Sequence, residues 1–521
     1  MIIDRLIGLA SPTAALDRAV QLIEQERFAA AFSLLARAAK AGIPDAEYRI
    51  ARCYLEGTGV PPSRAEGARW LERAASHNCV EAQSLLAALH VRGLAAACGT
   101  SLGDEAYSNH LFESDASAEP DFRSALKWAR QAAERGSPEA QALLGYILTH
   151  GPESLRDQDD ADRWYERSAM AGCAQGHLGY ALSLARRATN DKDHRQAANQ
   201  MRRAAAAKLP TAIYLLGVLT EHGTGVPRDP SLAAEYYRDA AENGHGPAQI
   251  KWGVALIEGR HGEQDLVAGE SWLRRAALAG NPRAAALLGD FYGHGGPFPP
   301  NYAEAASWYR RAAEAGDKSA ARALGSLYLT GAGVARDDVE AVRWFRSAAE
   351  QVPDAQFLYA RMLAEGRGTP SDLAGARAWF ARAADAGLPD AQVALAEMML
   401  NGRGGAASPA AAIELFDQAA AKGHSGAMFA LGAIHAGGGA VPIDHARAQR
   451  WFQAAAELGH GHAQLMLGRY LANAAAAEYD ADQARRWFEK ARSQGISEAE
   501  LELAELVASL GPQQQGPYAS C

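Results

Sequence analysis

The sequence predicts an all-α protein, an α-solenoid of about twelve two-helix repeats of about 36 residues with capping helices at both ends. Three observations lead to this fold class: a recurring tryptophan, a recurring glycine junction, and two short helical motifs that alternate along the chain. Of the 521 residues, 48% are hydrophobic and 22% are charged, so the chain can bury a full core. No run approaches the roughly 18 apolar residues of a membrane span, and we expect no direct membrane insertion.

Tryptophan marks the repeat. Nine of the ten tryptophans lie eight residues before a common junction, and most successive gaps are 36 residues or a multiple of 36. They are Trp70, Trp128, Trp164, Trp272, Trp308, Trp344, Trp379, Trp451 and Trp487. The junction is often glycine with proline two residues later, as in Gly136 with Pro138. Because glycine takes the left-handed conformation that ends a helix and proline suits a first helical turn, each junction predicts a helix end followed by a helix start.

Each repeat reads as two amphipathic helices. The first carries A-x-x-x-L-G-x-x-[YL], as in residues 284–292, and the second carries A-x-x-W-[YF]-x-x-A-A, as in residues 305–313. Spacings of three and four place the alanines, the leucine and the aromatic residues on one apolar stripe. We therefore expect the tryptophans and the aromatic residues beside them to be core rather than carbohydrate-stacking. One helix pair cannot bury its stripe alone, whereas stacked pairs can, which predicts a solenoid.

These motifs carry a family resemblance. The unit A-Q-x-x-L-G-x-x-Y, G-x-G-V and A-x-x-W-[YF]-x-x-A-A-x-x-G, clearest in residues 212–244, 284–316 and 320–349, resembles the Sel-like repeat (SLR), a branch of the tetratricopeptide superfamily. The resemblance covers twelve copies between about residues 43 and 495. It implies a right-handed superhelix that holds proteins together, often as an adaptor in signalling or in membrane-associated assemblies such as those that make bacterial polysaccharide.

Three parts are expected along the chain: N-terminal capping helices in residues 1–42, twelve repeats in one solenoid over residues 43–495, and a C-terminal capping helix with a mobile tail in residues 496–521. Repeat four (173–208) lacks both the tryptophan and the glycine-rich turn, and repeat ten has Leu415 and Phe416 at the tryptophan place. Either repeat is a candidate for a more flexible connection between its neighbouring repeats. An acidic insertion in repeat two, residues 94–120, is expected to be a mobile loop that gates the groove or binds a basic partner.

Charge and motif content argue against several function classes. The net charge of −9 disfavours a chain-wide attraction for nucleic acid. The five cysteines contain no C-x-x-C, which argues against a disulfide framework or a zinc site. Glycine-rich turns such as residues 57–59 follow helices and lack G-K-[ST], so they are expected to be turns rather than phosphate loops. No G-x-S-x-G or comparable catalytic context occurs, and we expect no enzyme, no cofactor and no metal.

The first ten residues have Asp4 and Arg5 inside their only apolar stretch. This composition differs from the apolar region of a signal peptide, and the expected compartment is the cytoplasm.

A binding surface is expected on the first helices, which line the concave side in tetratricopeptide-type folds. Residues two and six places after the opening alanine of each repeat share one face of the first helix, and the resemblance adds histidines at the last turn. The candidate residues are Tyr48, Arg52, Tyr146, His150, Tyr180, Tyr214, His222, His294, Phe357, Arg361 and Arg469. Aromatic and arginine side chains are typical of binding hot spots. The alternative is that the aromatic residues are second-layer packing.

The sequence thus favours a non-enzymatic scaffold or adaptor that binds one or more protein partners on the concave face. The first alternative is an accessory or regulatory subunit of a bacterial exopolysaccharide or envelope assembly, docked to a cytoplasmic domain of a membrane complex. The second is a hydrolase built on the solenoid.

Overall fold

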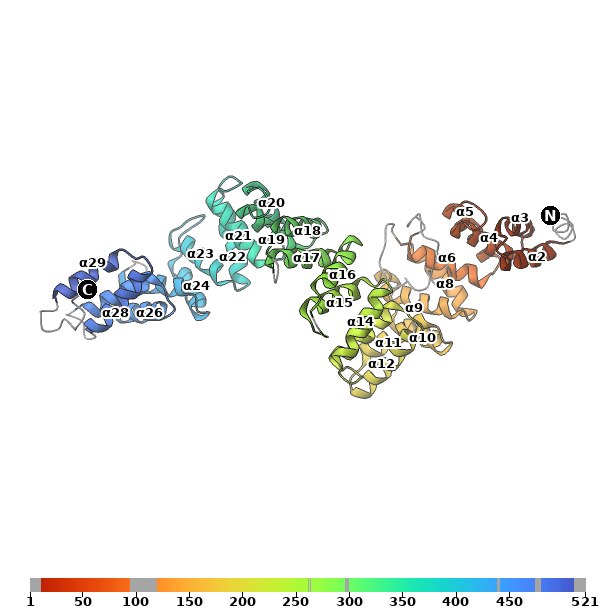
Figure 1. The fold of residues 1–521 in the computed structure, drawn as a ribbon, viewed down its shortest axis with the longest axis horizontal. Coiled ribbons are helices and arrows are strands. Elements are labelled where there is room, and N and C mark those ends of the chain that lie inside the picture. The colour runs from red at the N-terminus through yellow and green to blue at the C-terminus, as the bar shows by residue number, and fades with distance from the viewer. Residues whose placement is uncertain are drawn as a thin grey trace. The chain divides into compact units, whose positions relative to one another are not determined.

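The computed structural model describes residues 11–93, 120–260, 262, 264–295, 299–437, 441–473 and 479–509. These residues form 27 α-helices, one short 3-10 helix (η1, Glu153–Leu155) and no strand, so the predicted all-α class is confirmed. The chain divides into two compact units, Met1–Ala279 with helices α2 to α16 and Gly280–Cys521 with helices α17 to α29 (Figure 1). Among the described residues, no helix is both long and apolar enough to span a membrane.

Unit 1 starts with the pair α2 (Pro12–Glu24) and α3 (Phe28–Lys40), and α3 packs on the first repeat. Six repeats follow, each a pair of helices joined by a turn. The first helices are α4 (Pro44–Glu56), α6 (Val80–Val91), α9 (Pro138–His150), α11 (Ala174–Arg187), α13 (Pro210–His222) and α15 (Gly246–Glu258). The second helices are α5 (Arg64–Ser76), α8 (Phe122–Glu134), α10 (Gln158–Met170), α12 (Asp191–Ala206), α14 (Pro230–Glu242) and α16 (Leu266–Leu278).

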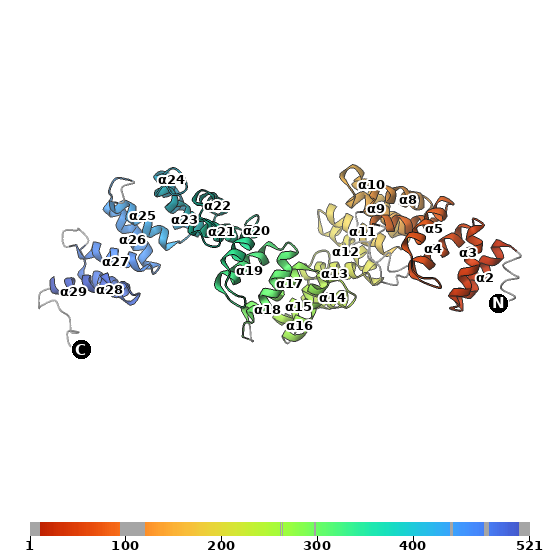
Figure 2. The same ribbon diagram turned by 90° about the horizontal axis from the view of Figure 1, so that it is seen from above.

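Unit 2 has six further repeats and a final helix, α29 (Glu498–Ser509), which packs on α28 and α27. The first helices are α17 (Pro282–His294), α19 (Lys318–Thr330), α21 (Pro353–Glu365), α23 (Pro389–Leu400), α25 (Ser425–Gly437) and α27 (Gly461–Ala472). The second helices are α18 (Tyr302–Glu314), α20 (Asp338–Ala348), α22 (Leu373–Asp385), α24 (Pro409–Ala421), α26 (His445–Glu457) and α28 (Ala481–Ser493). In both units the pairs follow one another along the chain, as with α11 and α12 or α21 and α22 (Figure 2).

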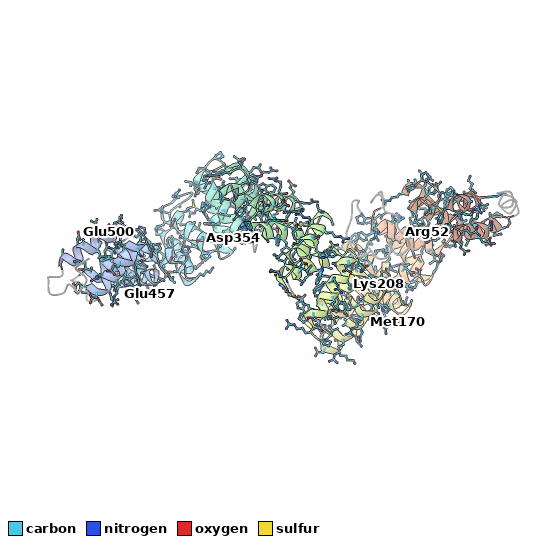
Figure 3. The ribbon with its side chains drawn as sticks, viewed as in Figure 1. Arg52, Met170, Lys208, Asp354, Glu457 and Glu500 are labelled. Atoms are coloured by element: carbon cyan, nitrogen blue, oxygen red, sulfur yellow. The ribbon has the colours of Figure 1, made fainter. Side chains whose placement is uncertain are left out.

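The helix boundaries follow from local chemistry. Many second helices begin after a side chain that accepts a hydrogen bond from the first turn; Asp229, for example, accepts from the backbone N–H of Leu232 at 3.0 Å, which satisfies an otherwise unpaired donor. The predicted glycine junctions are confirmed, because residues such as Gly136 have a left-handed φ of 95°. At two junctions without glycine, Asn78 and Lys208 take φ values of 68° and 59°; Lys208 is labelled in Figure 3.

The core of a repeat centres on the aromatic residue that follows the tryptophan. Phe345 is fully buried and Tyr309 is 6% exposed. The ring of each lies against the glycine of the L-G motif in the first helix, so that a Cβ added to Gly289 would stand 2.4 Å from the Tyr309 ring. Trp308 and Trp344 are buried as expected. The other tryptophans of the repeat are only half-buried, and the expectation that all of them are core is corrected: they lie at the edge of the core.

Repeat four forms a complete helix pair although it lacks the tryptophan and the glycine-rich turn. Its first helix is held to repeat three by Asp162 of α10, which is 5% exposed. The Asp162 carboxylate accepts hydrogen bonds from the Ser183 hydroxyl at 2.5 Å and from the Arg186 guanidinium at 3.0 and 3.1 Å. That repeat four is also a more flexible connection between its neighbouring repeats stays a prediction.

The expected insertion, residues 94–120, lies outside the described residues except for Pro120, and so does the expected C-terminal tail beyond residue 509. The helices on either side of the insertion, α6 and α8, pack against each other as the two helices of one repeat. The backbone N–H of Asp121 donates to the carbonyl of His90 at 2.9 Å. The insertion therefore leaves and re-enters repeat two at one turn.

Candidate protein-binding surface

Several successive first helices pack on each other. In unit 1, α6 packs against α9 and α9 against α11, although a second helix separates them in the chain; in unit 2, α17 packs against α19 and α27 against α29. The intervening second helices, such as α8 and α10 or α18 and α20, do not pack on each other in this way. We call the side of the repeats on which the first helices lie the inner side, and the candidate residues belong to first helices.

At the start of unit 1, Tyr48 is half-buried against the cluster that contains Ala51 and Leu71. Arg52, which Figure 3 labels on α4, donates from Nε to Glu56 at 2.9 Å. This i,i+4 ion pair is partly exposed, and such pairs contribute little to stability. Arg52 therefore presents a charged, oriented group on the inner side.

Tyr146 and His150 form one stacked unit on α9, with ring centroids 4.5 Å apart and an interplanar angle of 19°. Tyr146 is half-buried, while His150 is exposed at the C-terminal end of the helix. His222 and His294 are likewise exposed at the last residue of α13 and α17. The predicted last-turn position of the three histidines is confirmed. Burial lowers the pKa of His150, which favours its neutral form.

All five candidate aromatic residues pack against a core cluster, and two of them also meet other aromatic rings. The Tyr214 ring lies 5.7 Å from the ring of Tyr237 in α14 and 4.7 Å from His245 at the start of α15. Phe357 lies 5.6 Å from the ring of Phe380 in α22. Both are half-buried, so each joins helices together while it keeps an exposed edge on the inner side.

Two candidate arginines in unit 2 differ in their partners. The Arg361 guanidinium lies 5.9 Å above the ring of Phe357, an arrangement that combines an aromatic and a cationic group at one place. Arg469 donates from Nε to Glu502 of the final helix α29 at 2.6 Å. Arg469 therefore takes part in attaching the last helix, and less of its charge is available to a partner.

Tyr180 occupies a different place from Tyr146. Counting from the helix start, Tyr146 is the ninth residue of α9, whereas Tyr180 is the seventh residue of α11. The A-Q-x-x-L-G-Y motif is thus shifted by two residues in repeat four, and the two tyrosines lie on different faces of their helices. The Tyr180 hydroxyl donates to Glu166 of α10 at 2.9 Å, and burial and the nearby carboxylate raise the pKa of Tyr180.

The structure brings Tyr146 into contact with His150 and Phe357 into contact with Arg361. Phe429 of α25 was missed by the sequence reasoning, although its place matches that of Phe357. Its ring stacks on His460 with centroids 4.7 Å apart. The A-x-[YF] spacing, which Tyr214 and Phe357 share, is the signal that could have found it.

A second feature missed from the sequence is a charged group in repeat five. The Glu221 carboxylate accepts from the Tyr237 hydroxyl at 2.6 Å and from Lys251 at 3.1 Å. Glu221 and Tyr237 border a polar pocket of about 310 Å³ that also has Arg228 and Arg260 in its wall. Burial opposes ionisation, but the two hydrogen bonds outweigh it and hold the pKa of Glu221 below its ordinary value.

Metal-binding residue types do not cluster in the described part of the chain. No group of three or more histidine, cysteine or acidic side chains among these residues is arranged to hold a metal ion. Cys53 and Cys173 are buried, and burial raises the pKa of both thiols, which makes them poor nucleophiles.

The fold defines an α-solenoid repeat protein. The chain belongs to the Sel1 repeat family. The Sel1 repeat matches residues 44–79, 102–137, 138–173, 210–245, 246–281, 282–317, 318–352, 353–388, 389–424, 425–460 and 461–496. Of the twelve predicted copies, the one without a match is repeat four, which the structure nevertheless contains as the pair α11 and α12.

Relatives with assigned names match parts of this chain. Chitin synthase regulatory factor 3 of Schizosaccharomyces pombe is 28% identical over 244 residues, which cover 42% of this chain and 26% of that protein. Chitin synthase regulator SKT5 of Saccharomyces cerevisiae is 28% identical over 239 residues, covering 41% and 34%. The Sel1-repeat-containing protein YjcO of Escherichia coli is 28% identical over 167 residues, covering 31% and 72%. The chain thus spans between about a quarter and a third of the two fungal regulators.

Known crystal structures share the fold. A protective antigen of uropathogenic Escherichia coli displaying an SLR fold is 24% identical with a TM-score of 0.61, over 93% of this chain and 91% of that one. A Sel1 repeat protein from Oxalobacter formigenes is 33% identical with a TM-score of 0.50, over 59% and 90%. These likenesses confirm the predicted α-solenoid class.

Proposed function

We propose that this chain is a non-enzymatic scaffold that binds a protein partner on the inner side of its repeats. The observation that carries the proposal is the row of aromatic and charged side chains on the first helices, above all the Tyr146–His150 stack and the Phe357–Arg361 pair. Aromatic and arginine side chains that are half-buried and already oriented lose little conformational freedom on binding, and they supply a large share of interface energies.

A second candidate function is favoured by the names of two relatives. Both fungal proteins are chitin synthase regulators, and chitin synthase makes a polysaccharide. The chain would then be an accessory or regulatory subunit of a polysaccharide-synthesising envelope assembly, and its partner would be a cytoplasmic domain of a membrane protein. Both proposals place the chain in the cytoplasm and assign it the same inner surface.

The test is partner capture by crosslinking from the native cell, with the captured protein then purified for a binding measurement. Two double variants, Tyr146→Ala with His150→Ala and Phe357→Ala with Arg361→Ala, remove the two oriented pairs. At least one should weaken binding by roughly 2 kcal/mol, or about 30-fold in Kd. Met170→Ala is the control, because Met170 is 79% exposed at the end of a second helix and should leave binding unchanged.

Circular dichroism and melting must show that the double variants keep their fold. Binding that neither double variant changes would contradict the proposal, and so would an equal loss in the Met170 control. Capture of a polysaccharide synthase component would select the second candidate function.

A further inference from the structure

The tryptophan of several repeats has polar companions on its own helix. It lies six residues before the end of the second helix, as Trp164 does in α10 and Trp308 in α18. In three repeats a carboxylate four residues earlier accepts the indole N–H: Trp164 donates to Asp160 at 3.3 Å, Trp308 to Glu304 at 3.1 Å and Trp344 to Glu340 at 3.1 Å.

Three residues after the tryptophan, a cation covers the ring in six repeats. The pairs, with distances from cation to ring centroid, are Arg73 and Trp70 at 4.8 Å, Arg167 and Trp164 at 4.8 Å, Arg275 and Trp272 at 5.5 Å, Arg311 and Trp308 at 6.0 Å, Arg382 and Trp379 at 4.6 Å, and Lys490 and Trp487 at 3.9 Å. Acceptor, indole and cation occur together around Trp164 and Trp308.

Repeat four has polar side chains at the acceptor place and at the cation place, but it has no tryptophan between them. Gln200 stands six residues before the end of α12, with Gln196 at the acceptor place and Arg203 at the cation place. The Gln200 amide oxygen accepts from Nδ1 of the buried His177 at 2.7 Å, which holds its side chain against α11. Gln196 and Arg203 are exposed, and neither side chain makes a hydrogen bond or ion pair with the described residues.

A pocket of about 250 Å³ lies at this place, lined by Tyr180 and Leu184 of α11 and by Gln196, Asn199, Gln200 and Arg203 of α12. Repeat nine shows what occupies the same place elsewhere. Tyr359 is the seventh residue of α21, as Tyr180 is of α11, and its ring meets the ring of Trp379 edge-on at 5.6 Å. The pocket in repeat four is therefore the position of a missing indole.

We propose that repeat four binds a tryptophan side chain of the protein partner in this pocket. This inference rests on the proposed scaffold function and specifies one contact of it. The bound indole would lie against Tyr180 and Leu184, donate its N–H to Gln196, and receive the Arg203 guanidinium over its face. Cation–π attraction and an N–H acceptor are the interactions that surround the indoles of Trp164 and Trp308.

Three observations select this occupant. The pocket is smaller than the roughly 300–1,000 Å³ of sites for drug-sized ligands, which suits a single side chain. It is lined by one cation and no carboxylate, so the ammonium group of a free amino acid has no ion-pair partner among the lining residues. All ten tryptophans of the sequence lie in described helices and none of them lines this pocket, so the indole comes from another chain.

The experiment titrates the full chain with N-acetyl-5-fluorotryptophanamide, whose ¹⁹F signal is free of interference from the ten native tryptophans. We expect saturable binding to the wild-type chain. Gln200→Trp should abolish it, because the new indole fills the pocket under Arg203. Arg203→Ala, an exposed change that leaves the fold intact, should weaken it by about two- to fivefold, as loss of an exposed cation–π contact implies.

A reciprocal variant provides the matched control. Trp379→Gln removes the indole of repeat nine but keeps Tyr359 and Arg382, so it should add a second probe site to the chain. If this variant loses structure by circular dichroism, the same comparison is made with Trp164→Gln, which keeps Asp160 and Arg167.

Absence of saturable binding to the wild type would overturn the inference, as would binding that Gln200→Trp leaves unchanged. Tighter binding of unblocked 5-fluorotryptophan than of the blocked probe would also overturn it, since the site would then serve a free amino acid. The scaffold proposal is tested separately. It would be contradicted if the inner-side variants left partner binding unchanged, whatever repeat four binds. Purified partner must also bind Gln200→Trp more weakly than wild type, and equal binding would overturn the inference alone.

Discussion

A single missing side-chain carbon determines how closely the two helices of a repeat approach. At Gly325 an added Cβ would stand 2.8 Å from the Phe345 ring, and at Gly289 it would stand 2.4 Å from the Tyr309 ring. Where the chain has alanine at this place instead, as at Ala360 beside Phe380, the pair is still buried. The small residue and the ring therefore form one contact, and glycine is needed for packing where the ring lies as close as those of Tyr309 and Phe345 do.

Gly289→Ala should destabilise unit 2 by about 1–3 kcal/mol, because the new methyl group displaces the Tyr309 ring in a well-packed core. Thermal melting and urea unfolding measure the change. Gly246→Ala is the control: Gly246 begins α15 and has no atom within 4 Å of an added Cβ. A neutral result at Gly289 would show that the ring can move away without cost.

Glu221 makes the stability of unit 1 depend on pH. Its pKa is lowered from 4.5 in the folded chain, since the hydrogen bonds from Tyr237 and Lys251 outweigh burial. The stabilisation is therefore complete above the unfolded pKa and is lost as the pH falls through the folded pKa. Lys251→Met should flatten the fall in Tm between about pH 5 and pH 3, whereas Lys192→Met, at an exposed place on α12, should not. Equal pH profiles for the two variants would refute this coupling.

The sequence predicted the helices and their boundaries better than it predicted the candidate surface. The glycine and proline junctions place most helix boundaries, because left-handed glycine and first-turn proline act locally. Motif counting failed at Tyr180, since its motif moved by two residues within α11 while the helix start stayed in the 36-residue register. The candidate surface was harder to predict: whether Tyr214 packs or stays exposed depends on Tyr237 and His245, which lie on other helices.

The final helix α29 closes the last repeat, and its attachment can be tested. Ala499 is fully buried in the cluster that contains Phe488. Ala499→Glu should detach α29, because a carboxylate would have to be buried without a partner. Hydrogen exchange should then rise in α27, α28 and α29 while α17 and α18 stay protected. Ala504→Glu, at an exposed place on the same helix, should leave exchange unchanged, and an equal rise in both variants would show that α29 is not fixed through Ala499.

At the scale of the whole molecule, the extensive contacts in each unit join helices that are neighbours in the chain, with additional contacts between some successive first helices. Stability in such an array is close to a sum over repeats and their nearest-neighbour interfaces. A single ΔG of unfolding then describes the chain poorly, because parts can open on their own. Because each repeat contacts mainly its neighbours, the residues of one repeat can differ, as at Gln200 of repeat four, without changes in the other repeats. This property suits a scaffold.

Phe345→Ala tests this linearity. The side chain is fully buried between α19 and α20, so its truncation should cost roughly 3–5 kcal/mol locally. Because each repeat touches only its neighbours, calorimetry should show a broadened or split transition rather than a uniform shift. Hydrogen exchange should rise in α19 to α21 and stay low in α4 to α6. Val339→Ala, at a 63% exposed place on α20, is the control. A single sharp transition displaced as a whole would mean that the repeats unfold together, and the nearest-neighbour account would be wrong.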